Sequence, residues 1–411
     1  MGEAMKPAKQ SQPLKQRQLT LLLLIATVFD GVTQGVLLIQ ETIARKALFA
    51  SNFEITLIGV IVNTTLVFSV FFTYFYAHRN KRWLIAGGYL LGRFIFLFSF
   101  LIHRSGVFLI FLFFFHSLFS IQHPILNGFF ERYFGARRGL VFGVIRSVLM
   151  LMMMITALIV GKLLDINPSV FWMILTSVAF SGLVSYTIFF WIESKTEYSP
   201  EALDRQEHFL QTYKTIFRDR NFLVYEGLFM TYGFAYMLCL PTVPIFLLKT
   251  LKLSYFEMAQ AQGVYAQIFM MLSYPFAGRI FDRLDVWKVG AISYGVLVFY
   301  PLFFVFSYHT LSKPLAYTGL LVYSLGLSGV NMLWNLGCFS FARAGESFIY
   351  QGCHYALTGI RGFIGPLLGY AILTHFGVLT NFILAAVLFF AAAVGNGVYG
   401  RSIHRQWRSI P

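Results

Sequence analysis

The feature of this sequence that most constrains its fold is a series of long apolar segments separated by short polar loops. Each segment has about 20 residues or more, which is enough for an α-helix to cross the hydrocarbon core of a bilayer. We count twelve such segments, so a membrane is the solvent for most of the chain. The sequence therefore predicts an all-α polytopic membrane protein. The predicted spans are 19–43, 54–77, 83–103, 106–132, 139–163, 168–192, 221–248, 254–280, 287–309, 315–341, 349–375 and 379–401.

Composition agrees with this interpretation and excludes a soluble core. The chain is 57% hydrophobic and only 12% charged, whereas an average soluble domain is about 25% charged. The net charge of +15 could indicate nucleic-acid binding. However, the basic residues fall mostly in short runs between apolar spans, which is the distribution of cytoplasmic loops. We therefore expect no nucleic-acid partner.

The distribution of Lys and Arg also predicts the orientation of the chain. Most of the 32 basic residues lie on one side if the N-terminus is placed in the cytoplasm, so we expect both termini to be cytoplasmic. The one long polar stretch is predicted to be a cytosolic linker with a short amphipathic helix on the membrane surface. The expected divisions are an N-terminal tail (1–18), a six-helix bundle (19–192), the linker (193–220), a second six-helix bundle (221–401) and a C-terminal tail (402–411).

An internal repeat links the two sets of six spans. A charged hairpin between two apolar segments reads FAGRIFDRLDVWK at 276–288, and about half a chain earlier the string YFYAHRNKRW at 74–83 has its arginine and tryptophan in matching places. In addition, GVIR at 143–146 in the fifth span corresponds to TGIR at 358–361 in the eleventh. A duplicated six-helix unit of this kind places a cavity between the two halves near the middle of the membrane.

The later hairpin also carries a specific motif. Its residues Gly278, Asp282, Arg283 and Lys288 match much of the pattern G-x-L-A-D-R-x-G-R-R, a loop motif of the major facilitator superfamily of secondary transporters. The string RGLVFG at 138–143 is similar to the entry to the fifth helix in that superfamily. The chain thus resembles this superfamily over essentially its whole length.

The resemblance implies two pseudo-symmetric six-helix bundles that give alternating access to a central cavity. It further implies that Gly278, Asp282 and Arg283 act in gating rather than in substrate contact. The first copy of the motif departs from the pattern, because Tyr74 and His78 stand where the family has glycine and aspartate. The fifth span lacks the G-x-x-x-G-P-x-x-G-G signature of antiporters, so drug–proton antiport has no support from this motif.

Ionisable side chains inside the predicted spans are candidates for function, because a bilayer penalises an unpaired charge by a few kcal/mol. Asp30 and Arg93 lie near the predicted midplane, and Glu226, Arg146 and Arg361 lie nearer the cytoplasm. Asp30 either binds a proton or the substrate, or is the counter-ion of Arg93. Glu226 is a second candidate for proton coupling. Arg146 and Arg361 either anchor helix ends at the inner gate or hold an anionic substrate.

The resemblance also implies that the first, fourth, seventh and tenth helices line the cavity. In the fourth span, four polar residues at spacings of 4, 3 and 4 share one face, either as cavity lining or as helix-to-helix hydrogen bonds. In the tenth span, two asparagines one turn apart accompany a tryptophan. The predicted lining residues are Asp30, Gln34, His116, Ser120, His123, Asn127, Tyr232, Tyr236, Gln260, Gln267, Asn331, Trp334 and Asn335.

These observations predict a secondary active transporter of a small organic solute in the cell (inner) membrane, with proton coupling through Asp30. The alternatives are movement of a lysolipid-like amphiphile or a drug by the same fold, or a non-transporting membrane receptor or assembly factor. We expect no enzyme activity, because the sequence shows no nucleophile triad, metal-ligand cluster or phosphate loop. The expected partners are a small-molecule substrate and the lipid bilayer. We expect a monomer without metal or cofactor.

Overall fold

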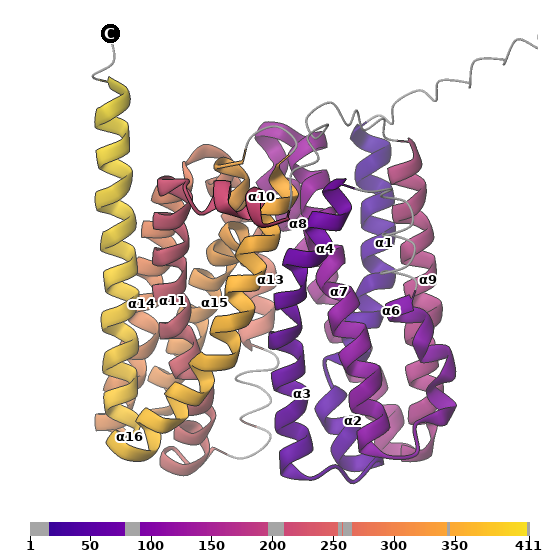
Figure 1. The fold of residues 1–411 in the computed structure, drawn as a ribbon. Coiled ribbons are helices and arrows are strands. Elements are labelled where there is room, and N and C mark those ends of the chain that lie inside the picture. The colour runs from indigo at the N-terminus through magenta and orange to yellow at the C-terminus, as the bar shows by residue number, and fades with distance from the viewer. Residues whose placement is uncertain are drawn as a thin grey trace, which may run out of the picture.

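The computed structural model describes residues 16–78, 91–195, 209–253, 257, 265–342 and 346–408, and the fold is given for these. Nearly all of them lie in helices, and no strand occurs among them, which confirms the all-helical prediction. Figure 1 shows the long helices side by side, with the start of α1 and the end of α16 at the same edge of the bundle. We call this edge the termini side and the other edge the opposite side.

The N-terminal half contains long helices interrupted by short 3₁₀ segments. Two of the predicted spans are broken in this way, because η1 divides the span predicted at 54–77 and η3 forms much of the span predicted at 83–103. The elements are α1 (Gln16–Leu37), α2 (Gln40–Ala47), α3 (Asn52–Thr64), η1 (Thr65–Phe68), α4 (Ser69–His78), α6 (Leu91–Phe94), η3 (Ile95–Leu101), α7 (Ser105–Phe134), η4 (Gly135–Arg137), α8 (Arg138–Ile166), η5 (Pro168–Val170) and α9 (Phe171–Lys195).

The C-terminal half begins after the linker helix. Its last element, α16, joins the two spans predicted at 349–375 and 379–401 and turns back at Gly377, whose φ of 85° is a conformation that glycine adopts easily. The linker helix is α10 (Phe209–Ile216), and the elements of the C-terminal half are α11 (Arg220–Ile245), the π-helical η6 (Phe246–Thr250), α13 (Ala266–Arg283), α14 (Val286–Thr310), α15 (Lys313–Leu336), η8 (Gly337–Ser340) and α16 (Ser347–Arg408).

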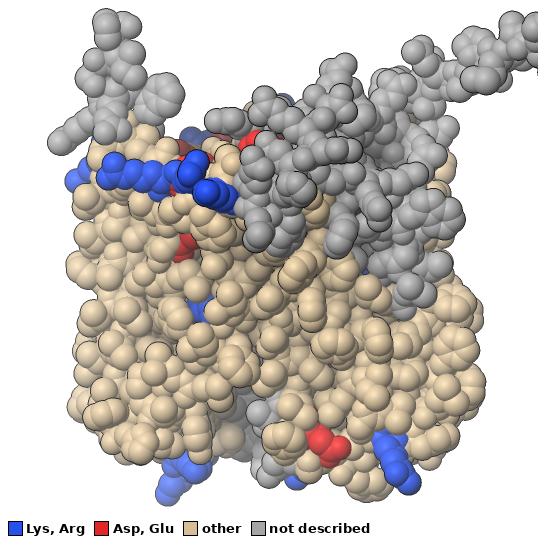
Figure 2. Space-filling model, in the orientation of Figure 1, with Lys and Arg blue, Asp and Glu red and all other residues tan. Residues whose placement is uncertain are grey.

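The surface has the character of a membrane protein. Seven of the described helical segments are long and apolar enough to cross a bilayer. In Figure 2 the charged side chains gather near the termini side and the opposite side, and a broad, almost uncharged band lies between them on the face in view. The apolar band covers the middle of the helices, where the hydrocarbon core of a bilayer would contact the protein.

Side chains at the helix ends explain where several helices begin. Asp219 caps α11 by accepting hydrogen bonds from the backbone N–H groups of Asn221 and Phe222, and Asp285 caps α14 in the same way through Lys288 N at 2.9 Å. The start of α3 has a capping box formed by Ser51 and Glu54. Such contacts satisfy N–H groups that the first turn leaves without a partner in the helix.

The two halves meet along two helix interfaces. α8 of the N-terminal half packs against α13, and α3 and α4 pack against α16. The crossing of α8 and α13 depends on glycine, because a Cβ atom on Gly278 would lie 2.1 Å from the carbonyl oxygen of Gly139. A Cβ on Gly143 would likewise lie 2.4 Å from the carbonyl oxygen of Tyr274. The absence of side chains lets the two backbones touch.

The hydrophobic core differs between the two sides of the molecule. One large cluster includes Leu19, Phe130 and Phe142 of the N-terminal half together with much of the C-terminal half. The part of the N-terminal half around Phe96 and Phe115 forms a separate cluster. The halves therefore share a continuous core toward the termini side, and on the opposite side the N-terminal half packs mainly against itself.

Candidate functional site

A cavity of about 330 Å³ lies between the two halves. Residues from both halves contribute to its wall, including residues of α1, α3, α7, α11, α15 and α16. A closed interface at the termini side and a chamber between the halves are what a carrier of small molecules requires. The lining residues are Gln34, Val62, Asn63, Leu66, His116, Phe119, Phe229, Tyr232, Tyr236, Met237, Leu327, Val330, Asn331, Trp334, Thr358 and Arg361.

The predicted lining residues divide into those in this wall and those elsewhere. Gln34, His116, Tyr232, Tyr236, Asn331 and Trp334 line the cavity, and so does Arg361, which was predicted as a buried cation. Asp30, Ser120, Asn127, Gln267 and Asn335 are described but lie outside the lining. Gln260 and the side chain of His123 lie outside the described part of the structure, as does most of the first hairpin copy at 74–83.

Aromatic rings form much of the wall on the C-terminal side. Tyr232 stacks on Tyr294 at a centroid distance of 4.8 Å, and Tyr236 stacks on Tyr323 at 6.1 Å. Trp334 packs edge-on against the ring of Tyr355 at 5.0 Å. These contacts hold the rings in place, so the cavity presents a preformed apolar surface to a guest.

Arg361 is the one Lys, Arg, Asp or Glu residue in the lining. Its Nη1 donates a hydrogen bond to the carbonyl oxygen of Phe229 at 3.0 Å, and its guanidinium lies 5.2 Å from the centre of the Phe229 ring and 5.7 Å from that of Tyr232. The residue is only 3% exposed. Among the described residues no carboxylate forms an ion pair with it. A desolvated cation without an acidic partner attracts anions.

The N-terminal half contributes amides and an imidazole to the same cavity. The His116 ring shares a hydrogen bond of 3.2 Å with Gln40 Oε1, and Asn63 Nδ2 donates to the carbonyl oxygen of Gly59 at 2.9 Å. Gln34 lies beside them in the wall. This side of the cavity therefore offers neutral polar groups to a substrate.

Asp30 and Arg93 form a buried ion pair in the N-terminal half. Arg93 Nη2 lies 2.5 Å from Asp30 Oδ1, and the guanidinium packs near the rings of Phe115 and Phe119. Arg93 also lies close against Gly182 of α9. This is the counter-ion arrangement that the sequence left open for Asp30. Its role in proton coupling stays a prediction.

A second buried acidic residue, Glu226, lies in the C-terminal half. Its Oε1 is 2.7 Å from His354 Nδ1, and both side chains are almost fully buried between α11 and α16. Sequence reasoning selected Glu226 but missed His354. The signal was available, since His354 is an ionisable residue inside the predicted span 349–375.

A cluster of polar side chains joins the halves next to Trp334. Asn127 Nδ2 donates to Asn335 Oδ1 at 3.2 Å and to the hydroxyl of Tyr355 at 3.0 Å, and Arg146 Nη2 also donates to Asn335 Oδ1 at 3.2 Å. Asn127 and Arg146 belong to the N-terminal half, and Asn335 and Tyr355 to the C-terminal half. Three residues that the sequence selected thus form one interface contact on the termini side of the cavity.

Asp282, a residue of the loop motif, makes a further contact between the halves. Its two carboxylate oxygens accept hydrogen bonds from the backbone N–H groups of Gly139 at 2.6 Å and Leu140 at 2.8 Å, at the start of α8. A carboxylate at a helix N-terminus also interacts favourably with the helix dipole. Asp282 lies beyond the predicted span, and burial raises its pKa, while these hydrogen bonds and the charge of Arg138 act to lower it.

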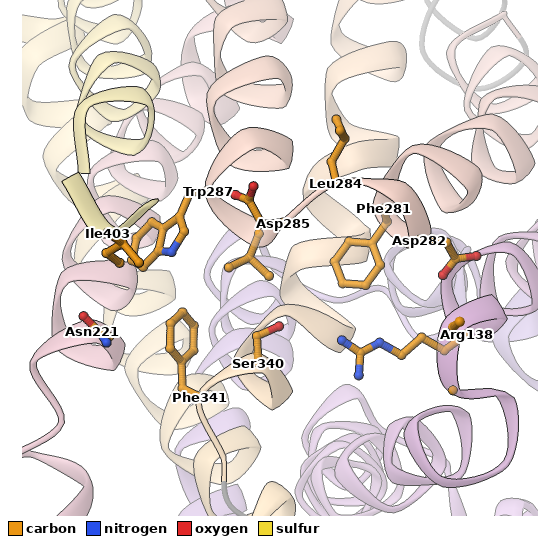
Figure 3. A pocket seen from close by; sticks show the side chains of 13 residues that line it. Arg138, Asn221, Phe281, Asp282, Leu284, Asp285, Trp287, Ser340, Phe341 and Ile403 are labelled. Atoms are coloured by element: carbon orange, nitrogen blue, oxygen red, sulfur yellow. The ribbon is translucent and has the colours of Figure 1, made fainter. Parts of the chain in front are cut away.

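A second hollow of about 570 Å³ lies next to this contact (Figure 3). Arg138 extends into it from α8, while Asp282 and Phe281 come from α13 and Trp287 from α14. The Arg138 guanidinium lies 5.7 Å from the centre of the Phe281 ring. Arg283, in contrast, is exposed. The hollow therefore lies at the contact between α8 and α13 and shares no lining residue with the central cavity.

Comparisons with known proteins agree with the fold. An all-helical bundle of two halves, joined on one side around a central chamber, defines the class of membrane transporters that carry small molecules. The sequence profile of the Major Facilitator Superfamily matches residues 20–352, and the chain belongs to this family. It is thus an integral multi-pass membrane protein and a secondary transporter, as the resemblance predicted. Members of the family are generally not enzymes.

Solved structures with the same fold include two of the transporter FucP and one of a human transporter. FucP in the outward conformation superposes with a TM-score of 0.72 at 14% identity, covering 92% of this chain and 98% of that chain. A variant of the E. coli fucose:proton symporter FucP gives 0.68 at 14% identity, with coverage of 92% and 98%. The human organic anion transporter MFSD10 (TETRAN) gives 0.63 at 14% identity, with coverage of 93% and 100%. No curated protein matches the sequence.

Proposed function

We propose that this protein moves a small organic anion with an apolar body across the membrane by alternating access. The observation that carries this proposal is Arg361, a buried guanidinium in a cavity otherwise lined by aromatic and aliphatic side chains, amides, hydroxyls and one imidazole. An anionic group of the substrate pairs with the guanidinium, and its apolar body lies against Tyr232, Tyr236 and Trp334. Amides such as Asn331 and Gln34 bind further polar groups of the substrate.

The membrane arrangement that we propose has twelve spans with both termini in the cytoplasm. Lys and Arg support this orientation, because most of them lie in loops on the termini side. The cytoplasmic side is then the closed side, held by the contacts of Asp282 with α8 and of Asn127 with Asn335. Transport requires these contacts to break as the halves rock about the cavity.

A ligand panel with one shared ring tests the substrate class. Benzenesulfonate supplies an anion, benzenesulfonamide a neutral analogue and benzyltrimethylammonium a cation, and each is added to the purified protein while its thermal unfolding is followed. We expect stabilisation by benzenesulfonate alone, because a ligand stabilises the native state in proportion to its occupancy. A lysophospholipid in the same panel tests the amphiphile alternative.

Two arginine variants then locate the anion site. Arg361→Gln removes the guanidinium from the cavity, and we expect it to weaken benzenesulfonate binding about 10- to 100-fold. Arg146→Gln is the matched control, because Arg146 occupies the corresponding repeat position but contacts Asn335 outside the cavity lining. Equal stabilisation by the sulfonate and the sulfonamide, or unchanged sulfonate binding by Arg361→Gln, overturns the anion assignment.

A further inference from the structure

Four buried polar atoms without hydrogen-bond partners cluster on the C-terminal side of the cavity. Among the described protein atoms these are Glu226 Oε2, His354 Nε2, Thr358 Oγ1 and Arg361 Nε, and each of the four residues is at most 7% exposed. Three of them lie on α16 at spacings of four and three residues, so they share one face of that helix. Buried polar groups are normally paired, and a group of exceptions at one place indicates a function.

The ring of Phe229 connects the buried pair to the cavity. The His354 ring packs against it at a centroid distance of 4.6 Å, and the Arg361 guanidinium lies 5.2 Å from the same ring. Thr358, one turn of α16 from His354, lines the cavity itself. Glu226 and His354 thus lie directly behind the wall in which we place the substrate anion.

We propose that the Glu226–His354 pair is the proton-binding site that couples transport to a proton gradient, and that the proton and the anion travel together. This inference rests on the proposed function, since it takes Arg361 as the anion site. The proton enters from the opposite side through the cavity, past the Thr358 hydroxyl, and adds to the unpartnered oxygen of Glu226 or nitrogen of His354. After the halves have rocked, the same proton leaves on the termini side.

The ionisable groups around the Glu226–His354 pair leave the pair able to bind one proton. Those within electrostatic reach of Glu226 are Tyr225 of α11, Tyr294 of α14, Cys338 of η8, and Cys353 and Arg361 of α16. Tyr225 and Cys338 use their hydrogens in bonds to the carbonyl oxygen of Leu333 and to Gln351. A carboxyl and an imidazole in hydrogen-bond contact titrate as a unit, and intramembrane acids and histidines are the usual elements of proton relays.

The sign of the coupling follows from charge. An added proton raises the charge of the pair by one unit, about two turns of α16 from Arg361, or roughly 10 Å. In a medium of low dielectric constant this charge favours an anion in the cavity. By thermodynamic reciprocity the bound anion raises the proton affinity of the pair by the same factor. This coupling between the proton site and the anion site therefore produces co-transport rather than exchange.

Infrared spectroscopy of the ligand-free protein tests the proton site directly. We expect a carboxylic-acid C=O band whose intensity changes with pH and that disappears in Glu226→Gln. In His354→Gln the midpoint of the same band should shift. His375→Gln is the matched control, because His375 is an exposed histidine on the same helix, and it should leave the band unchanged.

This measurement distinguishes the two sequence-selected carboxyls. Loss of the titrating band in Asp30→Asn but not in Glu226→Gln overturns the proposal and assigns the proton to Asp30. A protein with no carboxyl band that responds to pH overturns it as well. Because no ligand is present, the result does not depend on the substrate class.

Transport in proteoliposomes tests the coupling, with benzenesulfonate as a probe that stays ionised at every pH used. Wild type should bind this anion roughly ten-fold more tightly at pH 6 than at pH 8. Glu226→Gln should lose this dependence and the pH-driven accumulation while it keeps anion exchange between equal concentrations. Loss of exchange as well, in a folded variant, overturns the proposal. If wild type binds no benzenesulfonate but the Glu226 band titrates, the anion proposal fails and the proton site stands.

Discussion

The two halves of the molecule each hold a buried arginine against a glycine, but the two arginines have different partners. In the N-terminal half, Arg93 packs on Gly182 and pairs with Asp30 at 2.5 Å, outside the cavity lining. In the C-terminal half, Arg361 packs on Gly233, donates to a backbone carbonyl and lines the cavity. Glu226, the nearby acid of this half, pairs with a histidine instead.

The different partners give the two buried arginines different roles in this duplicated fold. A guanidinium with a carboxylate partner is neutralised within the protein, and removing either partner leaves an uncompensated buried charge. A guanidinium whose partner is a carbonyl keeps its net charge and is available to an anion. We therefore assign the pair of the N-terminal half to stability and the groups of the C-terminal half to the transported species.

Breaking the N-terminal pair should give the largest effect on stability. We expect Asp30→Asn to lower the free energy of unfolding by about 3–5 kcal/mol, because Arg93 keeps its charge in a dry site. Thermal unfolding in detergent micelles measures the change. The double variant Asp30→Asn/Arg93→Gln is the control and should recover part of the loss, since no charge then remains.

The opposite result would reverse the comparison. If Asp30→Asn is as stable as wild type, exchanges substrate normally and yet fails to accumulate it against a gradient, then Asp30 is the proton carrier that the sequence predicted. The structural assignment of the pair would then be wrong.

The two glycines provide a matched pair of substitutions. A Cβ atom on Gly182 would lie 2.1 Å from Arg93 Cδ, and one on Gly233 would lie 1.8 Å from Arg361 Nη1. We expect Gly182→Ala to cost about 1–3 kcal/mol of stability through overpacking. Gly233→Ala should instead weaken binding of the anionic probe, because it displaces the guanidinium. Unfolding curves and probe binding, measured on both variants, check this difference, and equal loss of binding in both would contradict it.

The sequence predicted the architecture because hydropathy and charge bias act locally along the chain. The positions of Gln34, His116, Tyr232, Asn331 and Trp334 in the cavity wall could be expected once the lining helices were inferred from the family resemblance. The different surroundings of Arg146 and Arg361 could not be predicted from the sequence. They occupy equivalent repeat positions, and only the rotation of each helix against its neighbours decides which of them contacts the cavity.

Most of the site features that the sequence did not predict are contacts between residues that lie far apart in the chain. Asn127 and Asn335 were both selected as cavity lining, but their hydrogen bond across the interface depends on how the halves dock. His354 and Thr358 gain their significance from Glu226 and Phe229 on another helix. A periodic pattern within one span carries no information about such a partner.

The contact of Asp282 with α8 extends the comparison to the interface between the halves. Asp282→Asn keeps the shape of the side chain but removes its charge and replaces one of the two oxygens that accept from Gly139 N and Leu140 N with an NH2 donor. We expect the free energy that favours the closed termini side to fall by about 1–2 kcal/mol, as for loss of a helix cap. Spin labels on α8 and α13 should report a larger population with the halves apart there. Asp285→Asn, a cap within the C-terminal half alone, is the control and should leave this distance unchanged.

The smallest effect concerns Glu54, a partly exposed carboxylate of the N-terminal half that contrasts with the two buried acids. It precedes the apolar segment Leu57–Tyr74. Hydrogen bonds from the Ser105 hydroxyl and from Ser51 lower its pKa below the ordinary value of 4.5. A carboxyl with a lowered pKa in the folded state stabilises the protein above its unfolded pKa, and this contribution is lost as the pH falls through the folded pKa. Hydrogen-exchange protection at the start of α3 should therefore decrease in acid in wild type and stay flat in Glu54→Gln. Equal pH dependence in both would show that these contacts do not act through the Glu54 charge.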